Sequence, residues 1–343
     1  MSLEFGIDTF GDVTWDAQGR DLSHGQVIRN VIEEAKLADA VGLDIFGLGE
    51  HHRDDFAVSA PDTILAAIAA VTSKIKLTSA VTVLSSDDPI RVFQRFSTIQ
   101  AISNGRAEVT LGRGSFTESF PLFGFDLSDY EMLFEEKFEI FSKLTSAEKI
   151  SWSGRHRTPL KSQAVYPRPE KPIPVWVGVG GTPESVVRAA TNNMSMSLAI
   201  IGGPPARFAP YAGLYREVRE KMDAAPLPIG CHSPGHIAAT DQQARDRFFD
   251  GYRVMHQRIG RTRGWPPLTR DAFEHEVENG ALYVGSPDTV ARKIAATVQA
   301  LDVQRFDLKY SAGPVSHEVL MDNIRLYGEE VVPRVRAILG LTT

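Results

Sequence analysis

Short apolar segments rich in β-branched residues alternate along the chain with longer segments of helical periodicity. In the segment 23–41, Val27, Val31 and Ala35 fall on one stripe between polar residues. Such a stripe is typical of a helix that packs one face against a core. The same alternation predicts strands over residues 3–9, 45–49, 75–84, 107–111, 175–179, 196–201, 227–239 and 305–310.

Amphipathic segments separate these strands. They predict helices over residues 23–41, 62–70, 90–102, 130–144, 183–192, 206–222 and 318–339. Regular alternation of strand and helix favours a parallel sheet covered by helices. Eight strands are enough for such a sheet to close on itself. The predicted fold is therefore an α/β fold, a (β/α)8 TIM barrel.

Two segments interrupt the alternation. Residues 148–165, which contain Trp152, predict an inserted hairpin, and residues 242–282 predict a helix followed by an Arg-rich turn and Trp265-Pro266-Pro267. Insertions in barrel enzymes gather at the catalytic face, so we expect the second one to be a lid or a dimer contact. Because no linker divides the sequence, residues 1–343 are expected to form a single barrel domain.

Composition narrows the class of protein. The chain has 343 residues, a net charge of −6 and 43% hydrophobic residues, as in ordinary soluble globular proteins. The absence of a basic run argues against nucleic acid as a partner. The lone Cys231 fits a reducing compartment, and no apolar run approaches the roughly 20 residues that span a bilayer. We therefore expect a cytoplasmic protein without a membrane partner.

Candidate chemistry begins where the second predicted strand ends, in Glu50-His51-His52-Arg53. Barrel enzymes carry their sites at the carboxyl ends of strands. His51 could act as a general acid or base, with Glu50 or a backbone group fixing its tautomer. Adjacent histidines in extended chain point to opposite faces, which weakens a metal site at His51 and His52. On the motif alone, a polar surface cluster remains open.

Two glycine-rich turns follow later strands. In Gly112-Arg113-Gly114-Ser115, glycines would let the backbone approach a ligand while the guanidinium binds an anion. In Gly180-Gly181-Thr182-Pro183, Thr182 suits a helix cap, and the following free N–H groups could bind a phosphate. On the motif alone, a tight turn is slightly favoured for the first segment. The second indicates a helix start more than a phosphate site, and Glu184 could satisfy the helix dipole itself. Residues 284–288 show the same kind of helix start.

The third predicted strand carries small and hydroxyl residues, among them Ala80, Val81 and Thr82. A flat ring could lie against such a backbone. The alternative is an ordinary buried strand, which the pattern alone favours.

Taken in order along nearly the whole chain, these motifs resemble the bacterial luciferase-like flavin-dependent monooxygenases. The matching segments are Phe5-Gly6-Ile7, Ala40-Val41-Gly42-Leu43-Asp44, Gly49-Glu50-His51-His52, Ile102-Ser103-Asn104-Gly105-Arg106, Leu111-Gly112-Arg113-Gly114, Pro174-Val175-Trp176-Val177-Gly178 and Val284-Gly285-Ser286-Pro287-Asp288.

The resemblance implies a barrel that binds reduced FMN as a co-substrate and acts with O2 on a small organic molecule, usually as a homodimer. By the same resemblance, His51 matches the family's catalytic histidine in its Glu-His-His motif. Arg113, Ser115 and Gly180-Gly181-Thr182 are expected at the flavin phosphate, and Ala80-Val81-Thr82 at the ring, where the family often has a non-proline cis peptide. Without a nicotinamide motif, reduced flavin is expected from a separate flavin reductase.

Three other functions remain open at this point. A deazaflavin (F420) cofactor would make the protein a hydride-transfer reductase of the same fold. A non-catalytic flavin-binding protein would have the same cofactor site, although the retained His51 argues against it. A metal-dependent hydrolase would use His51 and His52, whereas the resemblance implies no metal.

Overall fold

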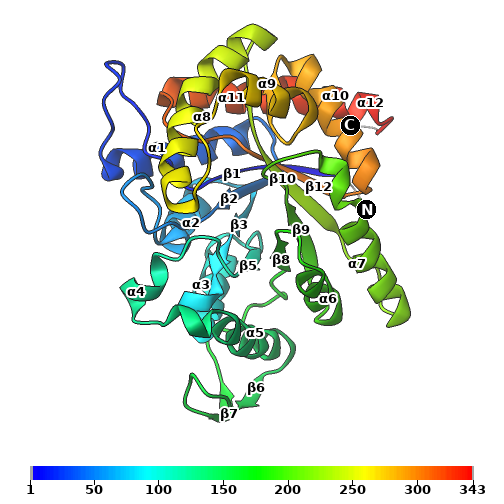
Figure 1. Cartoon of the computed structure of the whole chain (residues 1–343). Coiled ribbons are helices and arrows are strands. Elements are labelled where there is room, and N and C mark those ends of the chain that lie inside the picture. Colours follow the sequence, from blue (N-terminus) through cyan, green and yellow to red (C-terminus); the bar gives the residue numbers. More distant parts are fainter. Residues whose placement is uncertain (1–2, 342–343) are drawn as a thin grey trace.

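The computed structural model of the chain describes residues 3–341, and its parallel strands form a nearly closed barrel (Figure 1). The barrel strands are β1 (Glu4–Thr9), β2 (Ile45–Leu48), β3 (Lys76–Ser79), β4 (Thr82–Val83), β5 (Val109–Gly112), β8 (Val175–Val179), β9 (Ser195–Ala199), β10 (Ile229–Ile237) and β12 (Arg305–Lys309). They pair in the order β3-β2-β1-β12-β10-β9-β8-β5-β4. The two ends of the sheet meet, because β4 directly follows β3 in the chain and pairs with β5. An isolated parallel β-bridge between Leu77 of β3 and Ala107, just before β5, closes the gap further. The predicted barrel fold is confirmed.

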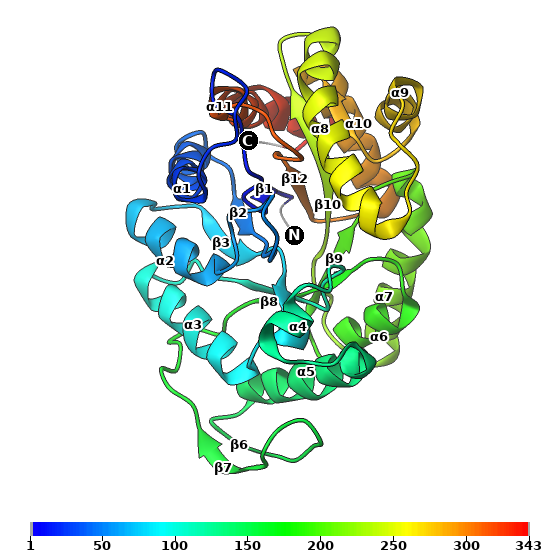
Figure 2. The ribbon, with the colours of Figure 1, turned by 60° about the vertical axis from the view of Figure 1, so that its left-hand side comes forward.

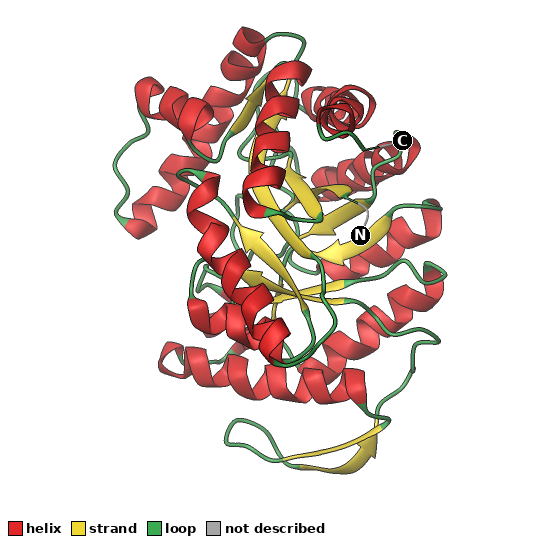
Figure 3. Cartoon of the chain, turned by 90° about the vertical axis from the view of Figure 1, so that its right-hand side faces the viewer, coloured by secondary structure: helices red, strands yellow, loops and turns green. Residues whose placement is uncertain are grey.

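Helices cover the outside of the barrel on all sides (Figures 2 and 3). They are α1 (His24–Ala40), α2 (Pro61–Val71), α3 (Pro89–Ile102), α4 (Ser119–Phe123), α5 (Tyr130–Ser146), α6 (Pro183–Thr191), α7 (Ala209–Lys221), α8 (Asp241–Arg263), α9 (Arg270–Asn279), α10 (Pro287–Leu301), α11 (His317–Leu326) and α12 (Val332–Ile338). None of the helices in the described part of the chain is long and apolar enough to cross a membrane.

Several predicted elements differ in detail from the observed ones. The strand predicted over 75–84 is divided into β3 and β4, because the ladder stops at Ala80 and Val81. The helix predicted over 318–339 is divided into α11 and α12 by a π-helical turn, Tyr327–Val331. α4 was not predicted, and a short strand, β11 (Tyr283–Gly285), precedes α10 and pairs with β10.

The two inserted segments have different positions relative to the barrel. The antiparallel pair β6 (Lys149–Trp152) and β7 (Leu160–Ala164) occupies the range of the predicted hairpin and projects away from the barrel (Figures 1 and 2). In the second insertion, Arg263 at the end of α8 donates a hydrogen bond of 2.9 Å to the carbonyl oxygen of Ser115, beyond β5. The insertion therefore reaches the C-terminal end of the barrel, while its function as a lid or dimer contact and the single-domain organisation stay predictions.

A buried ionic cluster fills the N-terminal end of the barrel. Arg305, the first residue of β12, donates to Glu108 over 2.6 Å and to both carboxylate oxygens of Asp307 over 3.1 and 2.9 Å. Its guanidinium also lies 4.8 Å from the ring centre of Trp176. Burial of a charge is tolerated only when it is paired and hydrogen-bonded, as it is here. The cluster closes one end of the barrel and leaves the other end for a ligand.

Loss of the central cation should destabilise the barrel strongly. In Arg305→Met, Glu108 and Asp307 would remain buried without their partner, so the free energy of unfolding should fall by about 3–5 kcal/mol. Urea unfolding followed by circular dichroism measures the change. The control Arg20→Met removes a pair whose arginine is 76% exposed and should cost less than about 1 kcal/mol. Equal effects of the two substitutions would contradict the stabilising role of the cluster.

Candidate active site

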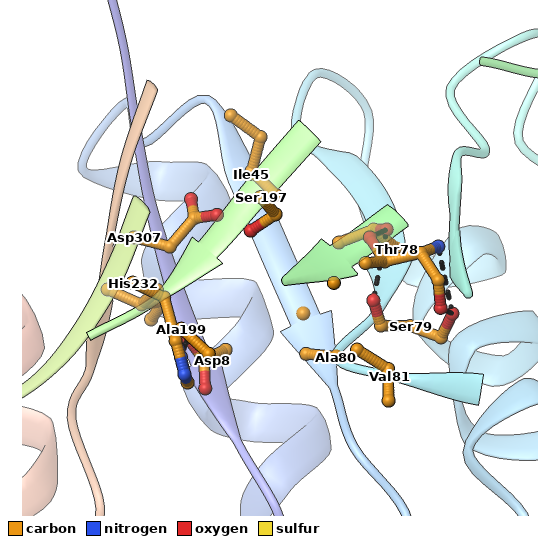
Figure 4. Close-up of a pocket in the computed structure, with 14 residues that line it drawn as sticks. Asp8, Ile45, Thr78, Ser79, Ala80, Val81, Ser197, Ala199, His232 and Asp307 are labelled. Carbon is orange, nitrogen blue, oxygen red and sulfur yellow. Dashed lines mark hydrogen bonds and ion pairs between the residues drawn. The ribbon is translucent and has the colours of Figure 1, made fainter. Parts of the chain in front are cut away.

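A cavity opens inside the barrel above the ionic cluster (Figure 4). It contains about 440 Å³ of empty space, part of which is open to solvent. Most barrel strands contribute to its wall, and most of its lining side chains are small. The lining residues are Ile7, Asp8, Ile45, Gly47, Thr78, Ser79, Ala80, Val81, Thr110, Gly178, Ser197, Ala199, His232 and Asp307. Small inward-facing residues therefore create the space that large ones would fill in a packed barrel.

The peptide between Ala80 and Val81 forms part of this wall and is cis, as the resemblance implied. Glycines let neighbouring strands approach it closely. A Cβ atom at Gly112 would lie 2.5 Å from Val81 Cγ2, and one at Gly49 would lie 2.4 Å from the carbonyl oxygen of Ala80. Thr82 is buried and donates to Ser79 Oγ over 2.9 Å, so its hydroxyl is used within the wall. Backbone and two apolar side chains are left to support a flat ligand.

His51 lies directly beyond β2, inside a group of aromatic rings. Its ring centre is 4.7 Å from that of Phe10, 4.5 Å from that of Phe56 and 4.3 Å from that of Phe116. Burial, together with the nearby cations Lys309 and Arg53, lowers the pKa of His51 to about 3. The imidazole is therefore neutral near pH 7.

Glu50 does not fix the tautomer of His51, contrary to one of the two possibilities that the sequence left open. Its Oε1 accepts a hydrogen bond of 3.2 Å from the N–H of Val83, and the described residues show no bond between the two side chains. Burial and the neighbouring Asp87 raise the pKa of Glu50 to about 8. Glu50 thus links the end of β2 to β4 and carries a proton at neutral pH.

The two glycine-rich turns lie side by side, because β5 and β8 are neighbours in the barrel. Arg113 Nη2 lies 3.5 Å from Thr182 Oγ1, at the start of α6. The Thr182 hydroxyl donates to Ser185 Oγ over 2.8 Å and makes no bond to the helix backbone, so the expected side-chain cap is not formed. Arg113 also pairs over 2.6 Å with Glu131, a largely exposed carboxylate. A guanidinium, two hydroxyls and the first N–H groups of a helix thus meet where a phosphate could bind.

Of the two glycines in this turn, Gly181 has a conformation that requires glycine, whereas Gly180 does not. Gly181 has a φ of +119°, which L side chains rarely adopt, and a Cβ at Gly180 would meet nothing within 4 Å. Ser115, by contrast, is exposed, and its carbonyl faces Arg263 of α8. Its expected contact with a cofactor stays a prediction.

The sequence matches the luciferase-like monooxygenase family over residues 9–304. The chain belongs to this family. Among its relatives, N-acetyl-S-alkylcysteine monooxygenase of Bacillus subtilis is 28% identical over 64% of this chain and 63% of its own length.

Solved structures share the luciferase-like fold at lower identity. The monooxygenase RslO1 of Streptomyces bottropensis has a TM-score of 0.83 at 24% identity, covering 96% of this chain and 99% of its own. The oxygenating constituent of 3,6-diketocamphane monooxygenase of Pseudomonas putida, in complex with FMN, has a TM-score of 0.78 at 19% identity, covering 98% and 99%. An F420-dependent secondary alcohol dehydrogenase has a TM-score of 0.76 at 17% identity, covering 98% of this chain and 100% of its own. The fold therefore accommodates both cofactors.

The sequence analysis of this luciferase-like barrel missed three polar residues at the site. Asp8 and His232 line the cavity and are joined over 3.0 Å between Oδ2 and Nδ1, and Ser185 adjoins Thr182. The available sign of Asp8 was a carboxylate inside the largely apolar first strand, whose other carboxylate, Glu4, stands at its start. No local pattern pointed to His232, because its partner is 224 positions away in the sequence.

His51 and His52 do not belong to a metal site within residues 3–341. No group of three or more His, Cys, Asp or Glu side chains that could hold a metal ion occurs there. His52 lies edge-on to Phe123, with ring centres 5.1 Å apart. The residues present do not favour the hydrolase alternative.

The aromatic surroundings of His51 generate a prediction about its titration. NMR of the imidazole nitrogens should show His51 neutral throughout the mildly acidic range, because its pKa falls from 6.5 to about 3 on folding. Unfolding then takes up a proton below pH 6.5, so His51 makes the fold less stable as the pH falls below that value. Phe116→Ala should admit water and raise the pKa of His51. Titration of wild-type His51 near 6.5 would disprove its desolvation.

Proposed function

We propose that this protein is a flavin-dependent monooxygenase that binds reduced FMN and acts with O2 on a small organic substrate. The observation that carries the proposal is the placement of three chemically distinct groups at one end of one barrel. These groups are the imidazole of His51, the flat wall at Ala80 and Val81, and the anion-binding group around Arg113. Relatives that oxygenate their substrates support the oxygenase activity.

The residues present fit a phosphorylated flavin. Arg113, Thr182 and Ser185, with the backbone of Gly180 and Gly181, would hold the phosphate, and Ala80 with Val81 would support the ring. Bound reduced FMN would supply the electrons and the reaction with oxygen. The protein would orient the cofactor, and the rings of Phe10, Phe56 and Phe116 partly shield His51 from water.

His51 is the residue that would move a proton. A neutral imidazole can take a proton from a group in contact with it and return it. Glu50 would keep β2 and β4 in register beneath it through its bond to Val83. Glu50 is therefore better described as a positioning residue than as a proton carrier to His51.

F420 is the second candidate cofactor, because an F420-dependent dehydrogenase shares the fold over nearly the whole chain. Titration of the purified apoprotein with reduced FMN and with reduced F420 separates the two. We expect tighter binding of FMN. The small-molecule substrate, a homodimer and a separate flavin reductase remain part of this proposal.

The phosphate site is tested by comparing FMN with riboflavin, which lacks the phosphate. Arg113→Ala should weaken FMN binding about 10- to 100-fold, the loss expected for a charge-assisted hydrogen bond, and leave riboflavin nearly unchanged. Fluorescence quenching of each flavin measures both constants. The control Arg325→Ala, at an exposed pair on α11, should change neither. Equal loss for the two flavins would remove Arg113 from the phosphate site.

The function of His51 is tested by turnover. His51→Ala should retain FMN binding within a few-fold and lower kcat about 10²- to 10⁴-fold, as expected for loss of a general acid or base. Oxygen consumption with chemically reduced FMN gives the rate once a substrate is found by screening. His52→Ala serves as the adjacent control. Wild-type turnover in His51→Ala would exclude His51 from the mechanism.

A further inference from the structure

A histidine other than His51 lines the cavity itself, on strand β10. His232 of β10 and Asp8 of β1 face each other across β12, with Nδ1 and Oδ2 3.0 Å apart (Figure 4). Asp8 is 2% exposed, and its Oδ1 is buried without a hydrogen-bond partner among the described residues. The His232 side chain is 16% exposed and lines the cavity together with Ala80 and Val81. A buried pair with unused bonding capacity thus faces the expected ligand.

The charges around this pair favour a protonated imidazole. Burial alone lowers the pKa of His232, but the charge and hydrogen bond of Asp8 raise it, and Asp307 of β12 raises it further. Lys309, also on β12, acts in the opposite direction, and the net direction is upward. Burial and Asp8 in turn raise the pKa of Asp307 to about 6, although Arg305 opposes them. The Asp8 carboxylate is therefore the main support of the His232 cation.

His236, on the same strand as His232, shows what burial does to a histidine that has no carboxylate partner. His236 is fully buried on β10 and stacks on Phe248 with ring centres 5.6 Å apart. Neither of its ring nitrogens has a partner among the described residues, and burial lowers its pKa to about 4. Simple core packing of a histidine in this barrel thus gives a neutral ring. The two histidines of β10 differ in having or lacking a carboxylate partner.

We propose that the Asp8–His232 pair binds the ring of reduced FMN and stabilises its negative charge, so that the site prefers the reduced cofactor to the oxidised one. This inference rests on the proposed function. His232 is the only lining residue in the described chain that can carry a positive charge. Asp8 and Asp307 line the same cavity, so the charge of His232 offsets that of Asp8 and acts on a ligand mainly as a charged hydrogen-bond donor, in a space where little water screens it. Charge beside the ring is also a recognised way for a protein to tune a flavin.

The pair acts by binding alone. No bond is made or broken at His232, and its proton stays on the imidazole beside Asp8. Oxidised FMN carries no negative charge on its ring, whereas the phosphate is charged in both states. The redox state of the cofactor therefore separates the contribution of His232 from that of Arg113.

The experiment measures four dissociation constants under argon by calorimetry, for oxidised FMN and dithionite-reduced FMN with wild type and with His232→Gln. Glutamine keeps a donor without the charge. We expect His232→Gln to weaken the binding of reduced FMN at least 10-fold and that of oxidised FMN less than 3-fold. A tenfold change in the dissociation constant corresponds to about 1.4 kcal/mol. Equal effects on both states, or none, would overturn the proposal.

Arg113→Ala is the matched control, because it should weaken both redox states equally. If Arg113→Ala weakens the binding of both redox states equally, and His232→Gln does so too or has no effect, the inference fails while the proposed function stands. If wild type binds FMN in neither state, the proposed function fails and the inference with it. These outcomes are distinguishable within one set of titrations.

A readout without cofactor tests the pair directly. NMR titration of the apoprotein should place the pKa of His232 above 6.5, the ordinary value, and Asp8→Asn should move it below that value. His236 should keep its low pKa in both proteins and serves as the internal control for correct folding. An unchanged pKa of His232 in Asp8→Asn, with His236 unperturbed, would contradict the role of Asp8.

Discussion

The unequal filling of the barrel is the constraint on which the rest of the structure depends. Arg305, Glu108, Asp307 and Trp176 occupy the N-terminal end with charges that satisfy one another. A cluster of this kind specifies one arrangement of strands, because a partner displaced by one position would leave a charge buried alone. Above the cluster, glycine, alanine and serine replace the large side chains that fill other barrels. The same interior is thus rigid at one end and hollow at the other.

The hollow end gathers its functional groups through the strand order. β2 and β4 are linked by Glu50 and Val83, and the glycines of β5 and β8 allow the close approach of Val81. A side chain larger than hydrogen at Gly112 would push Val81 into the cavity or separate the strands. The shape of the proposed ring site therefore depends on residues that have no side chain. Their contribution is visible only as the contacts that a Cβ would make.

Periodicity was enough to predict the barrel, because strands buried on both faces and amphipathic helices have distinct patterns. Local motifs marked Arg113 and Thr182 as candidate anion-binding residues and residues 80–82 as a possible wall for a flat ring. The resemblance to known flavin enzymes added the flavin phosphate and the cis peptide between Ala80 and Val81. The partner of Glu50 could not be obtained in either way, since Val83 reaches it only after β3 ends beside β2. Asp8 and His232 were missed for the same reason. Contacts between residues that are brought together only when the barrel forms cannot be predicted from a local sequence pattern.

His51 and the cavity residue His232 show how one fold can place a single residue type in two opposite electrostatic environments. Aromatic rings and cations around His51 favour its neutral form, whereas the carboxylate beside His232 favours the charged form. Titratable groups whose surroundings move their pKa values apart are the usual mark of divided acid–base work. A neutral imidazole can exchange a proton, and a charged one can hold an anion in place. If both environments were alike, the site could not bind a charged ring and still keep a free base beside it.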